Sequence, residues 1–155
     1  MRRSRLEFLY VQIAMLTSGI LGLTALAQSS GLTTLAAQRD QTRPLLIFAS
    51  KPDDPQMGIQ LRIIAEHAAE AQDRQIAPIV LPFNNPSPSA LQLSASDAEA
   101  ARRRFHVSPD EFVVILLGKD GGSKLRSKKP IPLARLEETI DGMPMRQDEM
   151  RNRVK

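Results

Sequence analysis

The chain has 155 residues, of which 42% are apolar and 25% charged, and its formal net charge is +4. This length accommodates one globular domain whose core needs no disulfide or structural metal. The lack of any cysteine excludes disulfides, zinc–thiolate sites, iron–sulfur clusters and thiol catalysis.

The first 27 residues predict a secretory signal peptide. Three arginines stand within the first five residues, residues 8–27 are mostly apolar, and Ala25-Leu26-Ala27 forms a small-residue cleavage site. The alternative is an uncleaved membrane anchor, because roughly 20 apolar residues can span a bilayer. Cleavage after Ala27 predicts a periplasmic or secreted protein with 18 basic and 16 acidic residues. The resulting charge of +2 argues against nucleic acid as a partner, and the membrane is a partner only through a retained segment.

The first half of the mature chain predicts a strand, a helix and a strand. Residue 45 begins a continuous apolar run typical of a strand covered on both faces. Asp54 and Pro55 predict a helix cap and first turn. The predicted elements are a flexible leader (28–42), a strand (45–49), an amphipathic helix (55–73), a strand (76–81) and a proline-rich surface loop (82–89).

The second half predicts a helix, a β-hairpin and a final helix. Ser96 and Glu99 have the spacing of a capping box, and Asp120-Gly121-Gly122 predicts a tight turn. The predicted elements are a helix from Ser96 to Arg104 or Phe105, a strand (112–117), a hairpin strand (124–126), a helix from Leu133 ended by Gly142, and a charged, frayed tail (146–155).

This element order predicts an α/β fold of the thioredoxin type over residues 43–145. The strand–helix–strand start implies a parallel pair with a right-handed crossover. The glycine-turned hairpin adds an antiparallel edge. Together they indicate a three-layer α/β/α sandwich, with a mixed sheet of about four strands that ends in a hairpin and a helix.

Three stretches resemble a bacterial family of domains of unknown function, whose related modules occur near the C-terminus of sushi-repeat-containing extracellular proteins. They are RPLLIFA at 43–49, the segment 103–126 with FVVILLGKDGGSKLR, and IDGMPMR at 140–146. The resemblance covers roughly residues 43–151. It implies a thioredoxin-like fold and an exported location, with no catalytic residues and no cofactor to carry over.

The first strand–helix junction is where a thioredoxin-type fold carries its redox thiols, which the helix dipole stabilises as thiolates. Here the junction contains Lys51, Asp53 and Asp54, and aspartate cannot exchange thiols. One interpretation is a loop that binds an anion or a peptide through Lys51 and free helix N–H groups. The other is a helix cap beside a solvated acid. Two neighbouring acids alone do not predict a metal site.

Ser108-Pro109 allows two interpretations. Thioredoxin-like proteins often carry a cis-proline beside the substrate groove just before the third strand. Alternatively, Ser108 and Glu111 have capping-box spacing, which predicts a turn with Pro109 at its first position.

Basic side chains gather on the predicted hairpin and on the helix before it. They are Lys119, Lys124, Arg126, Lys128 and Lys129, with Arg102, Arg103 and Arg104. Such a patch could engage an anionic glycan, lipopolysaccharide or a membrane surface. Alternatively, edge-strand lysines discourage pairing between sheet edges. His67 and His106 are predicted to pack at the edge of the core.

These features predict a non-enzymatic binding module whose partner is a protein or an anionic envelope or glycan surface. The alternatives are a small hydrolase or transferase using Asp53, Asp54 or Asp120, and a membrane-tethered accessory protein. No catalytic, cofactor-binding or metal-binding residue is predicted. The candidate binding surface comprises Lys51, Asp53, Asp54, Pro109, Lys119, Lys124 and Arg126.

Overall fold

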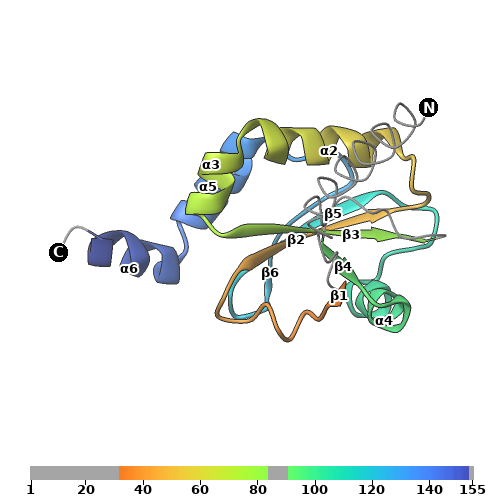
Figure 1. Cartoon of the computed structure of the whole chain (residues 1–155), viewed down its shortest axis with the longest axis horizontal. Coiled ribbons are helices and arrows are strands. Elements are labelled where there is room, and N and C mark those ends of the chain that lie inside the picture. The colour runs from red at the N-terminus through yellow and green to blue at the C-terminus, as the bar shows by residue number, and fades with distance from the viewer. Residues whose placement is uncertain (1–31, 84–90, 154–155) are drawn as a thin grey trace, which may run out of the picture.

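The computed structural model describes residues 32–83 and 91–153, which form one mixed sheet with helices on both faces (Figure 1). In chain order the elements are β1 (Leu32–Thr33), β2 (Arg43–Ala49), α2 (Pro55–Glu66), α3 (Ala68–Asp73), β3 (Ile76–Pro82), β4 (Leu91–Leu93), α4 (Ala95–Phe105), β5 (Val113–Leu117), β6 (Ser123–Ser127), α5 (Leu133–Asp141) and α6 (Pro144–Arg153).

The strand order of the sheet is β1-β4-β3-β2-β5-β6. β2 is parallel to β3 and antiparallel to β5, and β5 pairs antiparallel with β6. The four predicted strands are therefore neighbours in the order β3-β2-β5-β6. This mixed α/β arrangement is compatible with a thioredoxin-like fold, and the predicted fold class is confirmed.

The apolar runs of β2 and β5 are buried on both faces of the sheet. Leu45 and Ile47 belong to the core cluster under α2, α3 and α5. Leu46 and Phe48 belong to the cluster under α4 on the other face (Figure 1). Alternate residues of a strand point to opposite faces, so a sheet covered on both sides needs continuous apolar strands.

The helix predicted over residues 55–73 is broken at His67, which separates α2 from α3. His67 has φ −124° and ψ 42°, outside the helical region. Met57, Ile64 and Ala71 nevertheless lie in the same core cluster. The apolar stripe thus continues across the break, and for this reason the spacing predicts a single helix.

Two short strands lie beyond the four that the sequence predicts. β1 pairs in parallel with β4, and β4 pairs in parallel with β3. The segment expected to be an irregular leader therefore contributes a strand at the sheet edge. The signal peptide and most of the predicted loop over residues 82–89 lie outside the described residues. In residues 32–83 and 91–153, no helix is long and apolar enough to cross a membrane.

The N-terminal cap of α4 is Ser94, not Ser96 as the sequence predicts. The Ser94 Oγ accepts a hydrogen bond from the Asp97 N–H at 3.2 Å and lies 2.8 Å from the Asp97 carboxylate. The capping pair is thus Ser94 and Asp97, two residues before the predicted pair. At the other end α4 stops near the predicted residue, because His106 adopts φ 51° and ψ 54°.

Replacing Ser94 with alanine is expected to lower the free energy of unfolding by about 1 kcal/mol, because the Asp97 N–H loses its acceptor. The Ser96→Ala variant is the matched control, because it removes only the exposed contact of 3.0 Å between the Ser96 and Ser94 hydroxyls, and it should change stability by less than about 0.5 kcal/mol. Urea unfolding monitored by circular dichroism measures both. A larger loss for Ser96→Ala than for Ser94→Ala would contradict this assignment of the cap.

The C-terminal residues form a helix rather than the frayed tail expected from their charge. α6 begins with Pro144, a residue well suited to the first helical position. Arg146 in its first turn is only 3% exposed. Its partners Asp141 and Asp73, the second of them 73 residues away in the sequence, turn a charged segment into a docked helix.

Candidate functional site

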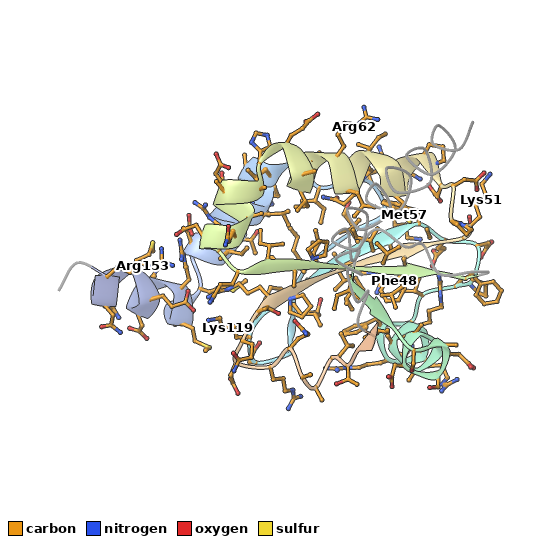
Figure 2. The ribbon with its side chains drawn as sticks, in the orientation of Figure 1. Phe48, Lys51, Met57, Arg62, Lys119 and Arg153 are labelled. Atoms are coloured by element: carbon orange, nitrogen blue, oxygen red, sulfur yellow. The ribbon has the colours of Figure 1, made fainter. Side chains whose placement is uncertain are left out.

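The strand–helix junction after β2 carries a helix cap and an exposed ion pair. The Asp54 Oδ1 accepts a hydrogen bond from the Gln56 N–H at 2.9 Å, which confirms the predicted cap. The Lys51 Nζ lies 3.6 Å from the Asp53 Oδ1, and both side chains are more than half exposed. Lys51 stands at the rim of the molecule in Figure 2. The two aspartates therefore do not converge on a common point.

Behind this junction, a buried guanidinium closes the carboxyl ends of β2 and β3. The Arg102 Nη2 donates to the carbonyl of Ala49 at 2.8 Å and to that of Leu81 at 2.7 Å. The Arg102 Nη1 donates to the carbonyl of Ser108 at 3.1 Å. The Ala49 and Leu81 carbonyls lie at the ends of their strands inside the protein, where a missing partner costs free energy. Arg102 therefore holds two strands and a turn together.

Arg102 was predicted within a surface run of basic residues, and this expectation is wrong. Its guanidinium lies 5.3 Å from the ring of Phe48 and 5.5 Å from that of Phe83. Burial lowers the pKa of Arg102. Of its neighbours, Arg103 pairs with Glu99, and the Arg104 Nη2 donates to the Gly121 carbonyl at 3.0 Å.

The Ser108–Pro109 peptide is trans, since the described residues contain no cis peptide bond. The Glu111 N–H donates to the Ser108 carbonyl, and the Ser108 N–H donates to the Glu111 carboxylate, both at 3.2 Å. The predicted turn is therefore present and the cis-proline interpretation is wrong. Pro109 is exposed at the outside of this turn.

Most of the hairpin cations have partners within the protein. Lys124 pairs with Asp120, Lys128 with Glu111 and Lys119 with Glu149, each at 2.7 Å. Arg126 donates to the carbonyls of Phe105 and His106 at the end of α4. The hairpin is therefore not an open basic patch. The predicted histidine packing is also wrong, because His67 and His106 are both exposed.

A cavity of about 490 Å³ lies between the β5–β6 turn and the start of α6. Three cations line it, namely Arg43 from β2, Lys119 from the turn and Lys124 from β6. Asp120 is the acid in its lining, and residues 142–145 form the opposite wall. Figure 2 shows Lys119 at the end of the sheet opposite Lys51. The predicted surface residues thus divide between two distant places.

One carboxylate serves two of these cations. The Glu149 Oε1 lies 3.0 Å from the Arg43 Nη2 and 2.7 Å from the Lys119 Nζ. The side chains of Arg43 and Lys119 are 1% and 10% exposed. Burial raises the pKa of Glu149, but hydrogen bonds from Lys119 and Arg43 outweigh it and lower the pKa. Glu149 is therefore ionised at neutral pH, and the cluster still carries an excess of positive charge.

The cluster around Glu149 also leaves two buried polar atoms without a hydrogen bond. Among the described residues, these are the Arg43 Nε and the Glu149 Oε2, although the Oε2 lies 3.7 Å from the Arg146 Nη1. Buried polar atoms in folded proteins nearly always have one. This end of the sheet is thus incompletely satisfied, whereas the Arg102 guanidinium donates to three carbonyls.

The turn that carries Lys119 contains two glycines where an added side chain would be crowded or strained. A Cβ on Gly118 would stand 2.5 Å from the Asp120 Oδ1 and 2.5 Å from the Lys124 Cε. Gly121 has φ +76°, in the region that favours glycine. Hydrogen bonds from Lys124 and from the Gly122 N–H lower the pKa of Asp120. The turn therefore holds an ionised aspartate and Lys124 at the mouth of the cavity.

α6 reaches the cavity because Arg146 anchors its first turn. The Arg146 Nη1 donates to the Asp73 carbonyl at 3.0 Å, and the Nη2 donates to the Asp73 carboxylate. The Arg146 Nε donates to the Asp141 Oδ1 at 3.3 Å. Sequence reasoning missed both Arg43 and Arg146 as members of this region, because the family stretches that contain them carry no known ligand and their partners lie on other elements.

A larger depression, of about 850 Å³, lies beside α2, α3 and β3. Its lining is mainly apolar, with Leu61, Ile64 and Pro78 among its members. Arg62 is the charged residue of that lining, and Figure 2 shows it on the outer side of α2. The described residues also hold no group of three or more potential metal ligands. Charged groups converge on a cavity at Lys119 rather than here.

Comparison with known proteins gives a family match over most of the chain. Residues 34–149 match the family described as Domain of unknown function (DUF4174). No curated protein matches the chain. The matched range includes the strand–helix junction and the whole lining of the cavity at Lys119.

Proposed function

The chain belongs to the DUF4174 family of domains of unknown function, and we propose that it is an exported, non-enzymatic binding module for an anionic ligand. The observation that carries the proposal is the cavity at the β5–β6 turn. Arg43, Lys119 and Lys124 line it, and Glu149 is shared between two of them. A cavity with a few convergent polar groups is the usual form of a ligand site.

The arrangement of carboxylates favours binding over catalysis. Asp53 and Asp54 follow the carboxyl end of β2, whereas Asp120 follows the carboxyl end of β5. Because β2 and β5 are antiparallel neighbours, their carboxyl ends point in opposite directions, and these acids lie at opposite ends of the strands. A carboxylate-dependent hydrolase or transferase would need two of these acids near one reacting bond. The proposed enzyme alternative therefore has no assembled acid–base pair in Asp53, Asp54 and Asp120.

The second part of the proposal is that this domain is related to thioredoxin. The order β3-β2-β5-β6, with one parallel and two antiparallel pairings, supports it. The resemblance to C-terminal modules of sushi-repeat-containing extracellular proteins belongs to the same proposal. On this view the place of the redox thiols is taken by a helix cap in front of the buried Arg102.

Export is proposed from residues 1–27, with cleavage after Ala27 and a periplasmic or secreted product. N-terminal sequencing of the protein from its native cell tests this proposal. We expect Gln28 as the first residue. Recovery of the intact N-terminus from the membrane fraction would instead favour a tethered accessory protein.

Binding is tested by titrating the purified protein with inorganic phosphate, a sulfated polysaccharide and a neutral dextran, using calorimetry. We expect at least one anion to bind and the neutral polymer not to bind. Raising the salt concentration should weaken the binding, because ions screen exposed charges. If no anion of any size binds, the proposed function is wrong.

A further inference from the structure

We propose that the ligand of this cavity is an amphiphilic anion, with one phosphate or carboxylate group and an apolar chain. This inference rests on the proposed function and names the chemical class of its ligand. It follows from the two unlike walls of the cavity. One wall carries the cations of β2, β6 and the turn, and the other is formed by residues 142–145.

The charged end of the ligand fits between Lys119 and Lys124. Lys119 shares Glu149 with Arg43, so one negative charge faces two nearly buried positive charges. The Lys124 side chain is 34% exposed and stands at the mouth. An oxyanion placed here would pair with Lys119, which shares one carboxylate with Arg43, and would compete with Asp120 for Lys124. Hydrogen bonds between such charged groups are stronger than those between neutral ones.

The start of α6 adds backbone donors to the same wall. The first hydrogen bond of this ten-residue helix runs from the Gln147 N–H to the Met143 carbonyl at 3.0 Å. Pro144 has no N–H, and the Met145 and Arg146 N–H groups have no acceptor in the described part of the chain. Free N–H groups at a helix N-terminus attract an anion, and Met145, which carries one of them, lines a cavity that is also lined by cations.

The apolar end of the ligand fits against Met143, Pro144 and Met145. All three line the cavity, and Met145 is 44% exposed. Methionine is flexible and adapts to apolar chains of different shape. The volume of about 490 Å³ exceeds what a bare phosphate ion needs and lies in the range of small-molecule sites. The chain of the ligand would cover Met145, the exposed apolar side chain of this wall.

The test measures binding of octyl phosphate below its micelle concentration, by calorimetry on the purified protein. Octyl phosphate should bind at least about tenfold more tightly than inorganic phosphate, since each buried methylene adds affinity. Lys124→Gln should weaken octyl phosphate about tenfold. Lys128→Gln is the matched control, because Lys128 lies on the same hairpin but pairs with Glu111 outside the cavity. Met145→Gln should weaken octyl phosphate while leaving inorganic phosphate unchanged.

Other outcomes would overturn the inference in distinguishable ways. Equal affinity for octyl phosphate and inorganic phosphate, or octyl phosphate binding unchanged by Lys124→Gln, would refute it. Binding of only the sulfated polysaccharide, weakened by Lys124→Gln, would refute it while leaving the proposed function intact. Equal binding of octylammonium would refute both. Binding to vesicles of phosphatidylglycerol is compared with binding to vesicles of phosphatidylcholine. Binding to the first alone identifies a lipid headgroup as the source of the anion, and binding to neither identifies a free anion.

Discussion

Replacing Arg102 with methionine is expected to lower the free energy of unfolding by about 3–5 kcal/mol. Methionine fills much of the apolar space beside Phe48, but it donates no hydrogen bond. The carbonyls of Ala49, Leu81 and Ser108 would then lose their charged donor. The Ala49 carbonyl keeps the Phe83 N–H at 3.1 Å and the Ser108 carbonyl keeps the Glu111 N–H at 3.2 Å, so the loss comes from hydrogen bonds to a charged donor, each worth about 1.5–3 kcal/mol.

Arg103→Met is the matched control for this prediction, because Arg103 lies on the same helix and is mostly exposed beside Glu99. Its loss should change stability by less than about 0.5 kcal/mol. Guanidinium chloride unfolding measures both variants. Equal, small effects of the two substitutions would show that Arg102 does not hold the strand ends.

Replacing Arg146 with methionine is expected to cost about 2–3 kcal/mol and to loosen α6 from the sheet. Arg146 is nearly buried and donates to Asp73 and Asp141. The two carboxylates are themselves 40% and 34% exposed, so water recovers part of the lost interaction. The expected loss is therefore smaller than for Arg102. Arg151→Met is the control, because Arg151 pairs with the exposed Asp148 and has no other ion pair in the described part of the chain.

The Arg146→Met variant is also expected to change how the stability of the protein falls at acid pH. Hydrogen bonds from Arg153 and Arg146 lower the pKa of Asp73 in the folded protein. A carboxyl with a lowered folded pKa stabilises the fold above its ordinary pKa, and that contribution is lost as pH falls toward the folded value. Arg146→Met should therefore flatten the loss of stability between neutral pH and pH 3. Stability curves with the same acid slope for both proteins would contradict this role of Arg146.

The strands could be predicted because their signals are local. The continuous apolar runs of β2 and β5 require burial on both faces, and the turn at Gly121 requires glycine. Such patterns depend on neighbouring residues alone. The break at His67, the strand β4 and the cap at Ser94 have weaker or competing local signals, and these are where prediction and structure differ.

The candidate site could be predicted only in part. Lys119 and Lys124 were predicted from the basic hairpin, and both line the cavity. Arg43, Arg102 and Arg146 were not, because a buried arginine is recognised by its partners, and these are distant in the sequence. The Arg43 Nη1 donates to the Arg74 carbonyl, 31 residues away, and the Nη2 to Glu149, 106 residues away. Arg102 bonds to Ala49, 53 residues away, and Arg146 to Asp73, 73 residues away. From composition alone, each of these arginines is expected to be a solvated charge at the surface.

The most direct test of the proposed binding site is a two-dimensional amide NMR titration of the purified protein with octyl phosphate. If the cavity at the β5–β6 turn is the site, the largest shifts should fall on the amides of residues 118–124 and on those of Met145 and Arg146. The amides of Lys51, Asp53 and Asp54, at the opposite end of the sheet, should stay unchanged. Shifts centred on residues 51–54, or no saturable shift at all, would contradict it.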